Sequence, residues 1–289
     1  MTKVLVTGGK GQLGQCLQSI SNDFKTLDFV FLGSNDLDIS NNIEVEAYFK
    51  NNTFDYCINC AAYTAVDKAE EETEKAKQIN EIGAKNLAHA CFKNNVTLIH
   101  ISTDFVFDGQ VKTPYTEEDK TNPISVYGKT KRDGELQITS TLSQYFIIRT
   151  SWLYSEFGSN FVKTMLRLSK EREELSVVDD QTGSPTYAKD LAAVILKIIN
   201  SKSQQFGIYH YSNQAEITWY DFAKEIFNLT KSSITLKKTD SKTFKTLATR
   251  PAYSVLNTKK IHTLLNFKPV NWQKSLDKCL KAITFDQNS

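Results

Sequence analysis

Tyr127 and Lys131 are the two residues of this sequence whose types and spacing most directly suggest chemistry. Residues 124–141 are predicted to be helical, so side chains four positions apart lie on the same face. A tyrosine phenol normally titrates at about pH 10, which makes it a reluctant proton donor at neutral pH. A lysine ammonium held beside the phenol would lower its pKa. The pair therefore predicts a general acid suited to protonating an alkoxide.

Thr103 adds a hydroxyl donor to this pair. It comes shortly after residues 97–101, an apolar run that is predicted to be a buried strand. From the end of that strand its hydroxyl can donate to the same carbonyl oxygen that Tyr127 protonates. A Tyr-x-x-x-Lys motif alone is common by chance, but the three residues together predict the reduction of a ketone.

A glycine-rich turn near the start of the chain predicts a dinucleotide site. Residues 4–6 form a short apolar run typical of a buried strand, and apolar residues at helical spacing follow the turn. Gly8, Gly11 and Gly14 lie between the two patterns, three positions apart. Glycine lets the backbone approach a pyrophosphate, and the helix N-terminus supplies unpaired N–H groups. A glycine-rich turn without a ligand is the alternative, which the strand and helix on either side disfavour.

The residues after the second predicted strand bear on the type of cofactor. Residues 29–32 form this strand, and Gly33, Ser34 and Asn35 follow it in place of an acidic residue. Proteins that select NAD often place Asp or Glu there to hold the ribose hydroxyls. The absence of an acid, together with Lys10 in the glycine turn, favours NADPH, with NADH as a second cofactor. The alternative for Lys10 is an ordinary solvated loop lysine.

The composition is that of an ordinary globular protein. The 289 residues are 40% hydrophobic and 24% charged, and the net charge of +2 is too small to predict nucleic acid or membrane as a partner. No apolar run approaches the length of a membrane span. Met1–Lys3 lead directly into the first strand and leave no room for a signal peptide, so we expect a cytoplasmic protein.

The five cysteines and four histidines do not predict a metal or redox site. Cys57 and Cys60 form a C-x-x-C pair, but residues three apart in a strand point to opposite faces. No second pair exists in the sequence, and the histidines lack the spacing of metal ligands. The cysteines are therefore interpreted as small buried residues.

Strand and helix patterns alternate along the chain, which is typical of a doubly wound Rossmann-type parallel sheet with a smaller α/β lobe. Residues 1–155, joined by about 177–204, are predicted to form the NAD(P)-binding domain. Residues 205–289, joined by about 156–176, are predicted to form the substrate-binding lobe.

The sequence resembles the short-chain dehydrogenase/reductases in its GxxGxxG turn and Tyr-x-x-x-Lys motif, and more narrowly the dTDP-4-dehydrorhamnose reductases. Matching segments occur along nearly the whole chain. They are residues 11–14 (GQLG), 59–68 (NCAAYTAVDK), 102–108 (STDFVFD), 127–131 (YGKTK), 149–154 (RTSWLY), 160–166, 180–186 (DQTGSPT) and 250–256.

The resemblance implies that NAD(P)H donates hydride to C4 of a 4-keto-6-deoxy sugar carried on dTDP, that Tyr127 protonates the oxygen, and that Lys131 holds the nicotinamide ribose. It also implies a cofactor site lined by Gly11, Gln12, Leu13, Asp38, Ile39, Ala62, Tyr63 and Thr64, to which the local pattern adds Gly8, Lys10, Gly14 and Ala61. The sugar contacts that it implies are Thr103, Asp104 and Trp152. Arg250 is a candidate for the diphosphate, because a guanidinium binds phosphate in a bidentate manner, and a surface salt bridge is its alternative.

Two departures from related sequences narrow these expectations. Phe105 stands where nucleotide-sugar 4,6-dehydratases have a catalytic glutamate, so dehydration is disfavoured; many reductases have a tyrosine there. Some reductases dimerise through Mg²⁺ held by glutamates at the positions of Cys16 and Lys189. Because a thiol and an ammonium are poor ligands for Mg²⁺, no metal is predicted, and the protein is expected to be a monomer or a homodimer.

Two other functions remain open at this point. The same fold serves as a non-catalytic, NADP-binding regulatory subunit of methionine adenosyltransferase, although the intact Thr103, Tyr127 and Lys131 argue against that role. The second alternative is a reductase that produces the C4 epimer of the sugar, since the sequence does not determine which face of the ketone receives the hydride.

Overall fold

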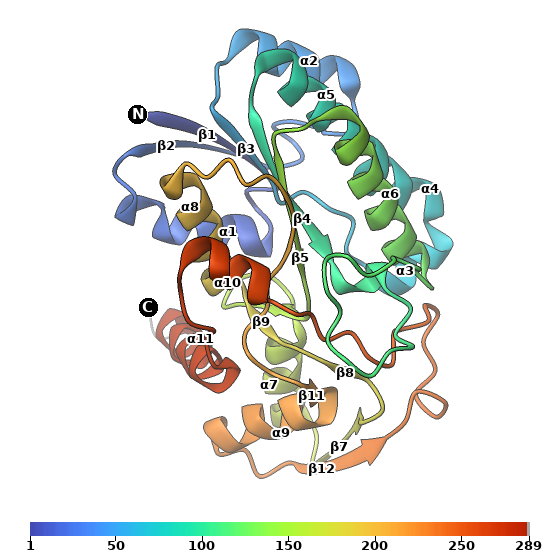
Figure 1. The fold of residues 1–289 in the computed structure, drawn as a ribbon. Helices are drawn as coiled ribbons and strands as arrows, with labels where there is room; N and C mark the ends of the chain where they lie inside the picture. Colours follow the sequence, from blue (N-terminus) through green and yellow to red (C-terminus); the bar gives the residue numbers. More distant parts are fainter. Residues whose placement is uncertain (288–289) are drawn as a thin grey trace.

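A central sheet of six parallel strands organises the fold, in the order β10-β5-β4-β3-β1-β2 (Figure 1). The computed structural model describes residues 1–287. The six strands are β1 (Thr2–Thr7), β2 (Leu27–Leu32), β3 (Tyr56–Asn59), β4 (Thr97–Thr103), β5 (Tyr145–Thr150) and β10 (Gly207–His210). The chain reverses its direction of winding between β1 and β3, which is where open sheets of this type bind ligands.

Helices cover both faces of this sheet (Figure 1). The helices on one face are α1 (Gln12–Ile20) and α8 (Ala188–Ser201), and those on the other are α2 (Asn42–Asn51), α5 (Gly83–Asn94) and α6 (Val126–Thr141). Val4 and Val6 contribute to the core on the first face and Leu5 to the core on the second. Burial on both faces explains why the strands are continuous apolar runs. The predicted fold class is confirmed.

A smaller lobe with its own hydrophobic core lies beyond the carboxyl end of β4 (Figure 1). It contains three pairs of short strands: β6 (Leu153–Tyr154) with β9 (Thr186–Tyr187), β7 (Glu174–Val178) with β12 (Thr235–Thr239), and β8 (Thr182–Gly183) with β11 (Ile217–Thr218). Its helices are α7 (Phe161–Glu171), α9 (Trp219–Thr230) and α11 (Trp272–Gln287). Within residues 1–287, no helix is both long enough and apolar enough to cross a membrane.

Two parts of the chain differ from the prediction. The sequence pattern predicts one long helix or two shorter ones over residues 67–94, and the structure divides this stretch into α3 (Val66–Glu71), α4 (Thr73–Lys77), a π-helical turn η2 (Gln78–Ile82) and α5. Strand β10 lies beyond residue 205 yet pairs with β5, and α10 (Lys259–Leu265) contacts α8 and β10. A boundary at residue 205 therefore does not separate the sheet from the smaller lobe, and the division into two domains stays a prediction.

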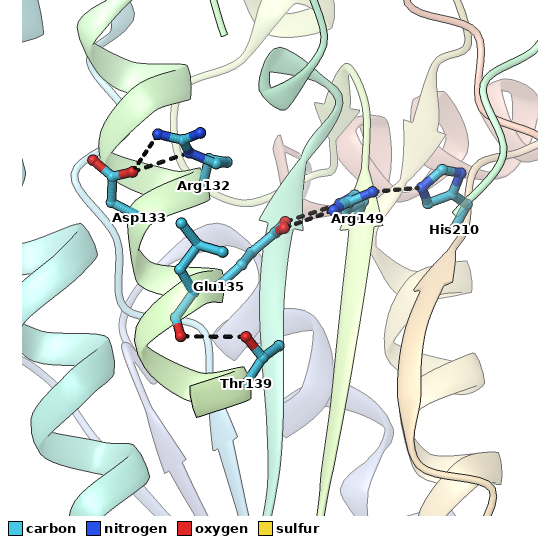
Figure 2. Close-up of polar contacts among 7 residues, drawn as sticks. Arg132, Asp133, Glu135, Thr139, Arg149 and His210 are labelled. Carbon is cyan, nitrogen blue, oxygen red and sulfur yellow. Dashed lines mark hydrogen bonds and ion pairs between the residues drawn. The ribbon is translucent and has the colours of Figure 1, made fainter. Parts of the chain in front are cut away.

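A buried ion pair fastens α6 to the central sheet (Figure 2). Arg149 on β5 donates from Nε and Nη2 to the two carboxylate oxygens of Glu135 on α6, at 2.9 and 2.7 Å. Its Nη1 lies 3.4 Å from Nε2 of His210 on β10, whose Nδ1 lies 3.1 Å from the carbonyl oxygen of Tyr115. Burial and the neighbouring guanidinium lower the pKa of His210 to about 3, so its ring is neutral and accepts from Arg149.

Glu135→Gln is expected to lower the free energy of unfolding by about 3–5 kcal/mol, because it leaves the Arg149 guanidinium buried without a counter-charge. Urea unfolding with an unchanged m-value measures this loss. Glu174→Gln is the matched control, since it breaks the exposed pair with Lys237 and should have a much smaller effect. Equal losses in the two variants would contradict the anchoring role of the buried pair.

Candidate active site

The predicted site residues converge at the carboxyl edge of the central sheet. The glycine turn follows β1, residues 60–64 follow β3, and Thr103 ends β4. Helix α6 contacts β4 and the short 3₁₀ helix η3 (Asp104–Val106) beyond it, so it brings Tyr127 and Lys131 to the same edge. The parallel arrangement of these strands therefore assembles one site from segments that lie far apart in the sequence.

The glycine turn allows a close backbone approach. Gly8 has φ of +67°, and a Cβ atom on it would lie 2.5 Å from the backbone nitrogen of Ala61. A Cβ atom on Gly14 would collide with the carbonyl oxygen of Gly8. Helix α1 begins at Gln12 without a side-chain cap on its first N–H groups. A tight turn before an uncapped helix N-terminus fits the diphosphate of a dinucleotide.

The side chains of α1 link the turn to the smaller lobe. Leu13 is buried in the core, so only its backbone can face a ligand. The amide nitrogen of Gln12 donates to the carbonyl oxygen of Leu153 at 3.3 Å, and its oxygen accepts from Ser155 and Asn160. Gln12 is thereby fixed between the first helix and the residues after β5.

Lys10 has a partner that the sequence reasoning missed. Its ammonium lies 3.3 Å from the carboxylate of Asp36, which also accepts from the backbone nitrogen of Gly33 at 2.8 Å. These contacts, the Gly33 hydrogen bond first, lower the pKa of Asp36. An acid does therefore follow β2, four residues after Leu32, where the turn folds it back towards Lys10. The signal available in the sequence was that Asp36 lies only four positions after the end of β2.

The other predicted cofactor residues differ in how far they are exposed. Asp38 and Thr64 are exposed, Ala61 and Ala62 are half-buried, and Ile39 and Tyr63 are buried. Asn80 of the π-helical turn fixes this region, because its amide oxygen accepts from Tyr63 N at 2.8 Å. Its amide nitrogen donates to Tyr63 O and to Thr130 Oγ1, both at 3.1 Å. Asn80 was not predicted, since a π-helical turn leaves no clear pattern in the sequence.

The structure brings Tyr127, Thr103 and Asp104 together. Burial raises the pKa of Tyr127 to about 12, Asp104 adds to the rise, and a hydrogen bond with Thr103 opposes it. The direction is opposite to the lowering predicted from sequence. The reason is that Nζ of Lys131 donates to the carbonyl oxygen of Ile101 at 2.7 Å and does not contribute to the phenol's pKa.

Asp104 is buried beneath this group of residues. The Thr103 hydroxyl donates to its Oδ1 at 3.0 Å. Burial raises the pKa of Asp104 to about 6, although hydrogen bonds with Ser254 and Thr103 act against the rise. Asp104 is therefore ionised at neutral pH and protonated in mildly acidic solution. Phe105, the departure noted in the sequence, places its ring edge-on to Tyr127 with 5.5 Å between centroids.

Trp152 adopts a strained conformation that its neighbours support. Its φ is +46°, and its ring stacks on that of Trp219 with centroids 3.6 Å apart and planes 9° from parallel. A Cβ atom on Gly183 would lie 2.5 Å from the Trp152 ring. Trp219, 67 positions away in the sequence, was not predicted. A stacked, tightly bounded indole forms a rigid wall for a ligand.

Arg250 is engaged within the protein. Its Nη2 donates to Oδ2 of Asp67 at 2.7 Å and its Nη1 to Oδ1 at 3.1 Å. The pair ties a loop before α10 to the start of α3, next to the predicted cofactor segment. A salt bridge, the alternative given for Arg250, is thus present, and the diphosphate contact stays a prediction.

Cys16 and Lys189 lie close to a buried carboxylate. The Lys189 ammonium is 2.6 Å from Oε1 of Glu156, and the Tyr187 hydroxyl donates to Oε2 at 3.0 Å. Burial, with a contribution from Glu156, raises the pKa of Cys16 to about 12. Among residues 1–287, no group of three or more His, Cys, Asp or Glu side chains is placed to hold a metal ion. Lys189 neutralises this carboxylate directly.

The arrangement can bind a dinucleotide beside a proton donor. The glycine turn and the uncapped start of α1 fit a phosphate, and Tyr127 lies beside the Thr103 hydroxyl and the Asp104 carboxyl, one helical turn before Lys131. Fold and site together define the class of the protein: a Rossmann-type α/β oxidoreductase that uses a nicotinamide dinucleotide.

Comparison with known proteins identifies the family within this class. The family model described as "RmlD substrate binding domain" matches residues 1–285. The chain belongs to this family, that of the dTDP-4-dehydrorhamnose reductases. A dTDP-4-dehydrorhamnose reductase from Aggregatibacter actinomycetemcomitans is 39% identical over 286 residues, which cover 96% of this chain and 97% of the relative.

Solved structures agree with this assignment. A dTDP-4-dehydrorhamnose reductase from Clostridium acetobutylicum is 42% identical, with a TM-score of 0.94 over 98% of this chain and 100% of its own. One from Bacillus anthracis, solved in complex with NADP, is 39% identical with the same TM-score and coverage.

Removal of divalent cations is expected to change neither activity nor oligomeric state, because Lys189 already neutralises Glu156. Sedimentation at one protein concentration, with EDTA and then with Mg²⁺, measures the mass, and NADPH oxidation measures the activity. A mass that depends on Mg²⁺ would show that other carboxylates hold the ion.

Proposed function

We propose that the protein reduces the C4 ketone of dTDP-4-dehydro-β-L-rhamnose to give dTDP-β-L-rhamnose, with NADPH as the preferred cofactor. The observation that carries the proposal is that Tyr127, Lys131 and Thr103 lie at the same carboxyl edge of the sheet as the glycine turn, in a chain of this family. Whole-length similarity to named reductases supports the same substrate class.

The cofactor residues proposed for the chain fit a dinucleotide. The N–H groups at the start of α1 face the diphosphate, while Gly8 and Gly14 leave room for it. Ala61 and Ala62 lie at the end of β3, where small side chains allow the nicotinamide half to approach. When bound, the reduced nicotinamide supplies the hydride to C4 of the sugar.

Tyr127 is the proposed proton donor to the sugar oxygen. With a pKa of about 12 it remains fully protonated at neutral pH, so the acid form is always available. It becomes a better acid when Lys131 turns from the Ile101 carbonyl towards the ribose and approaches the phenol. Thr103 holds Tyr127 by a hydrogen bond and in turn donates to Asp104.

The substrate residues lie on the side of the smaller lobe. Trp152 is proposed to pack against the sugar ring, and the ionised Asp104 to accept from a sugar hydroxyl. Arg250 reaches the substrate diphosphate only by exchanging Asp67 for phosphate, since both carboxylate oxygens are engaged in the present pair. We propose that the central sheet binds the cofactor and the smaller lobe the sugar nucleotide.

Tyr127→Phe is expected to lower turnover by roughly two to four orders of magnitude, because it removes the general acid and keeps the ring. NADPH oxidation with the 4-keto sugar nucleotide measures turnover, and NMR of the product identifies the configuration at C4. Tyr48→Phe on α2 is the control and should behave as the parent does. Turnover of Tyr127→Phe within tenfold of the parent would exclude Tyr127 as the acid, and the C4 epimer as product would correct the proposed reaction.

Substitution of Lys10 by Glu is expected to weaken NADPH binding roughly fivefold to tenfold while NADH binding changes less, since the lysine would pair with the 2′-phosphate. Asp36→Asn should shift the preference in the opposite direction, because it removes a negative charge beside that phosphate. Titration by protein fluorescence gives a dissociation constant for each cofactor in the parent and in both variants. Equal losses for the two cofactors in Lys10→Glu would contradict this account.

A further inference from the structure

A line of buried polar contacts runs behind Lys131, starting from the end of β1. The Thr7 hydroxyl donates to Oδ1 of Asn59 at 2.8 Å, and Nδ2 of Asn59 lies 3.0 Å from Nδ1 of His100. On the other side of the ring, Nε2 of His100 lies 3.3 Å from Nζ of Lys131. All four residues are buried, and His100 is only 1% exposed. None of the steps proposed above uses His100.

The direction of these hydrogen bonds follows from one backbone group. The N–H of Ala61 can only donate, and it points at Oδ1 of Asn59 at 3.1 Å. The Asn59 amide nitrogen therefore faces His100, and it donates to Nδ1. A neutral imidazole that accepts at Nδ1 carries its proton on Nε2. This tautomer follows from the donors and acceptors around the ring.

The Nε2–H of His100 consequently points at Lys131. A charged ammonium has three N–H donors and no acceptor, so it would face another donor at 3.3 Å. A neutral amine avoids the conflict, since it accepts from His100 and donates to the Ile101 carbonyl oxygen. In the opposite tautomer, Nδ1–H of His100 would face the amide nitrogen of Asn59, which is also a donor. Exchanging the amide oxygen and nitrogen of Asn59 would remove that conflict but would leave the Ala61 N–H without its acceptor.

We propose that His100 is a positioning residue of the reductase site, which opposes the charged form of Lys131 until the dinucleotide binds and draws the lysine to its ribose. The inference rests on the proposed function for the identity of the cofactor. His100 acts through Lys131 and does not touch the reacting atoms.

The other groups around Lys131 agree with this role. Burial lowers the pKa of Lys131 to about 8, and the nearby Glu135 on α6 and, when ionised, Cys60 after β3 oppose the lowering. Glu135 is already paired with Arg149, and burial keeps the Cys60 thiol protonated by raising its pKa. The Tyr127 phenol is also neutral at neutral pH, because burial raises its pKa to about 12.

Cofactor binding should therefore be linked to the uptake of a proton. With a free-state pKa of about 8, Lys131 is mostly neutral at pH 9, and the ribose hydroxyls and phosphates favour its ammonium form. Because the bound pKa is higher than the free one, NADPH affinity should fall as pH rises above about 8. Below this pH the lysine is charged in both states, and no proton is exchanged.

Calorimetric titration of the protein with NADPH, in two buffers of different ionisation enthalpy, counts the protons without any turnover. We expect uptake of nearly one proton per NADPH at pH 9 and little at pH 6.5. His100→Gln, which presents an amide oxygen to Lys131, should reduce the uptake at pH 9 by at least half. His262→Gln on α10 removes a histidine remote from this line of contacts and should leave the uptake unchanged.

A second variant keeps the proposal testable if His100→Gln fails to fold. Asn59→Asp places an acceptor against Nδ1 of His100, so the ring carries its proton on Nδ1. The lone pair at Nε2 then faces Lys131 and accepts from its ammonium, and the proton uptake at pH 9 should again fall. Absence of proton uptake by the parent at pH 9, or parental uptake in His100→Gln, would overturn the inference. Normal NADPH binding and proton uptake without reduction of the 4-keto sugar would instead contradict the proposed function.

Discussion

The buried ion pair between Glu135 and Arg149 is the constraint on which the site depends. Tyr127, Lys131 and Glu135 follow one another at intervals of four on α6, so they share one face of the helix. When Arg149 holds Glu135 against β5, that face is fixed towards the sheet, and Tyr127 and Lys131 reach its carboxyl edge. The same pair neutralises Glu135, the carboxylate whose charge acts on Lys131, and no ion pair is formed by Lys131 among residues 1–287. One interaction therefore sets both the position and the charge balance of α6.

The remaining parts of the site are supplied by the ends of parallel strands. Glycine is needed at position 8 because the turn after β1 passes within contact distance of Ala61 after β3. Polar side chains then connect residues 60–64 to α6, through Asn59 at the end of β3 on one side and Asn80 in the π-helical turn on the other. Such buried amides are satisfied only in one arrangement, so they specify the geometry as well as stabilise it.

Local patterns were sufficient to predict the fold and to select residues that lie together at one edge of the sheet. The apolar run before Gly8, the triplet spacing and the Tyr127–Lys131 spacing each reflect a periodicity of a single element. Contacts between distant elements left no such trace: Trp219 stacks on Trp152, Asp36 folds back to Lys10, and β10 pairs with β5. The pKa of Tyr127 was predicted in the wrong direction because spacing along a helix does not reveal where a lysine side chain points.

The late position of β10 in the chain has a consequence for how the protein is made. During synthesis, β5 is complete after residue 150, but its neighbour in the sheet follows only at residues 207–210. Until then β5 presents an unpaired edge with apolar side chains, including Phe146 and Ile148, that the mature core buries completely. A nascent chain with an open apolar edge is prone to pair with other chains. The part of the smaller lobe from β6 to β9 lies between these two strands in the sequence, so its synthesis delays closure of the sheet and lengthens the period in which this apolar edge stays open.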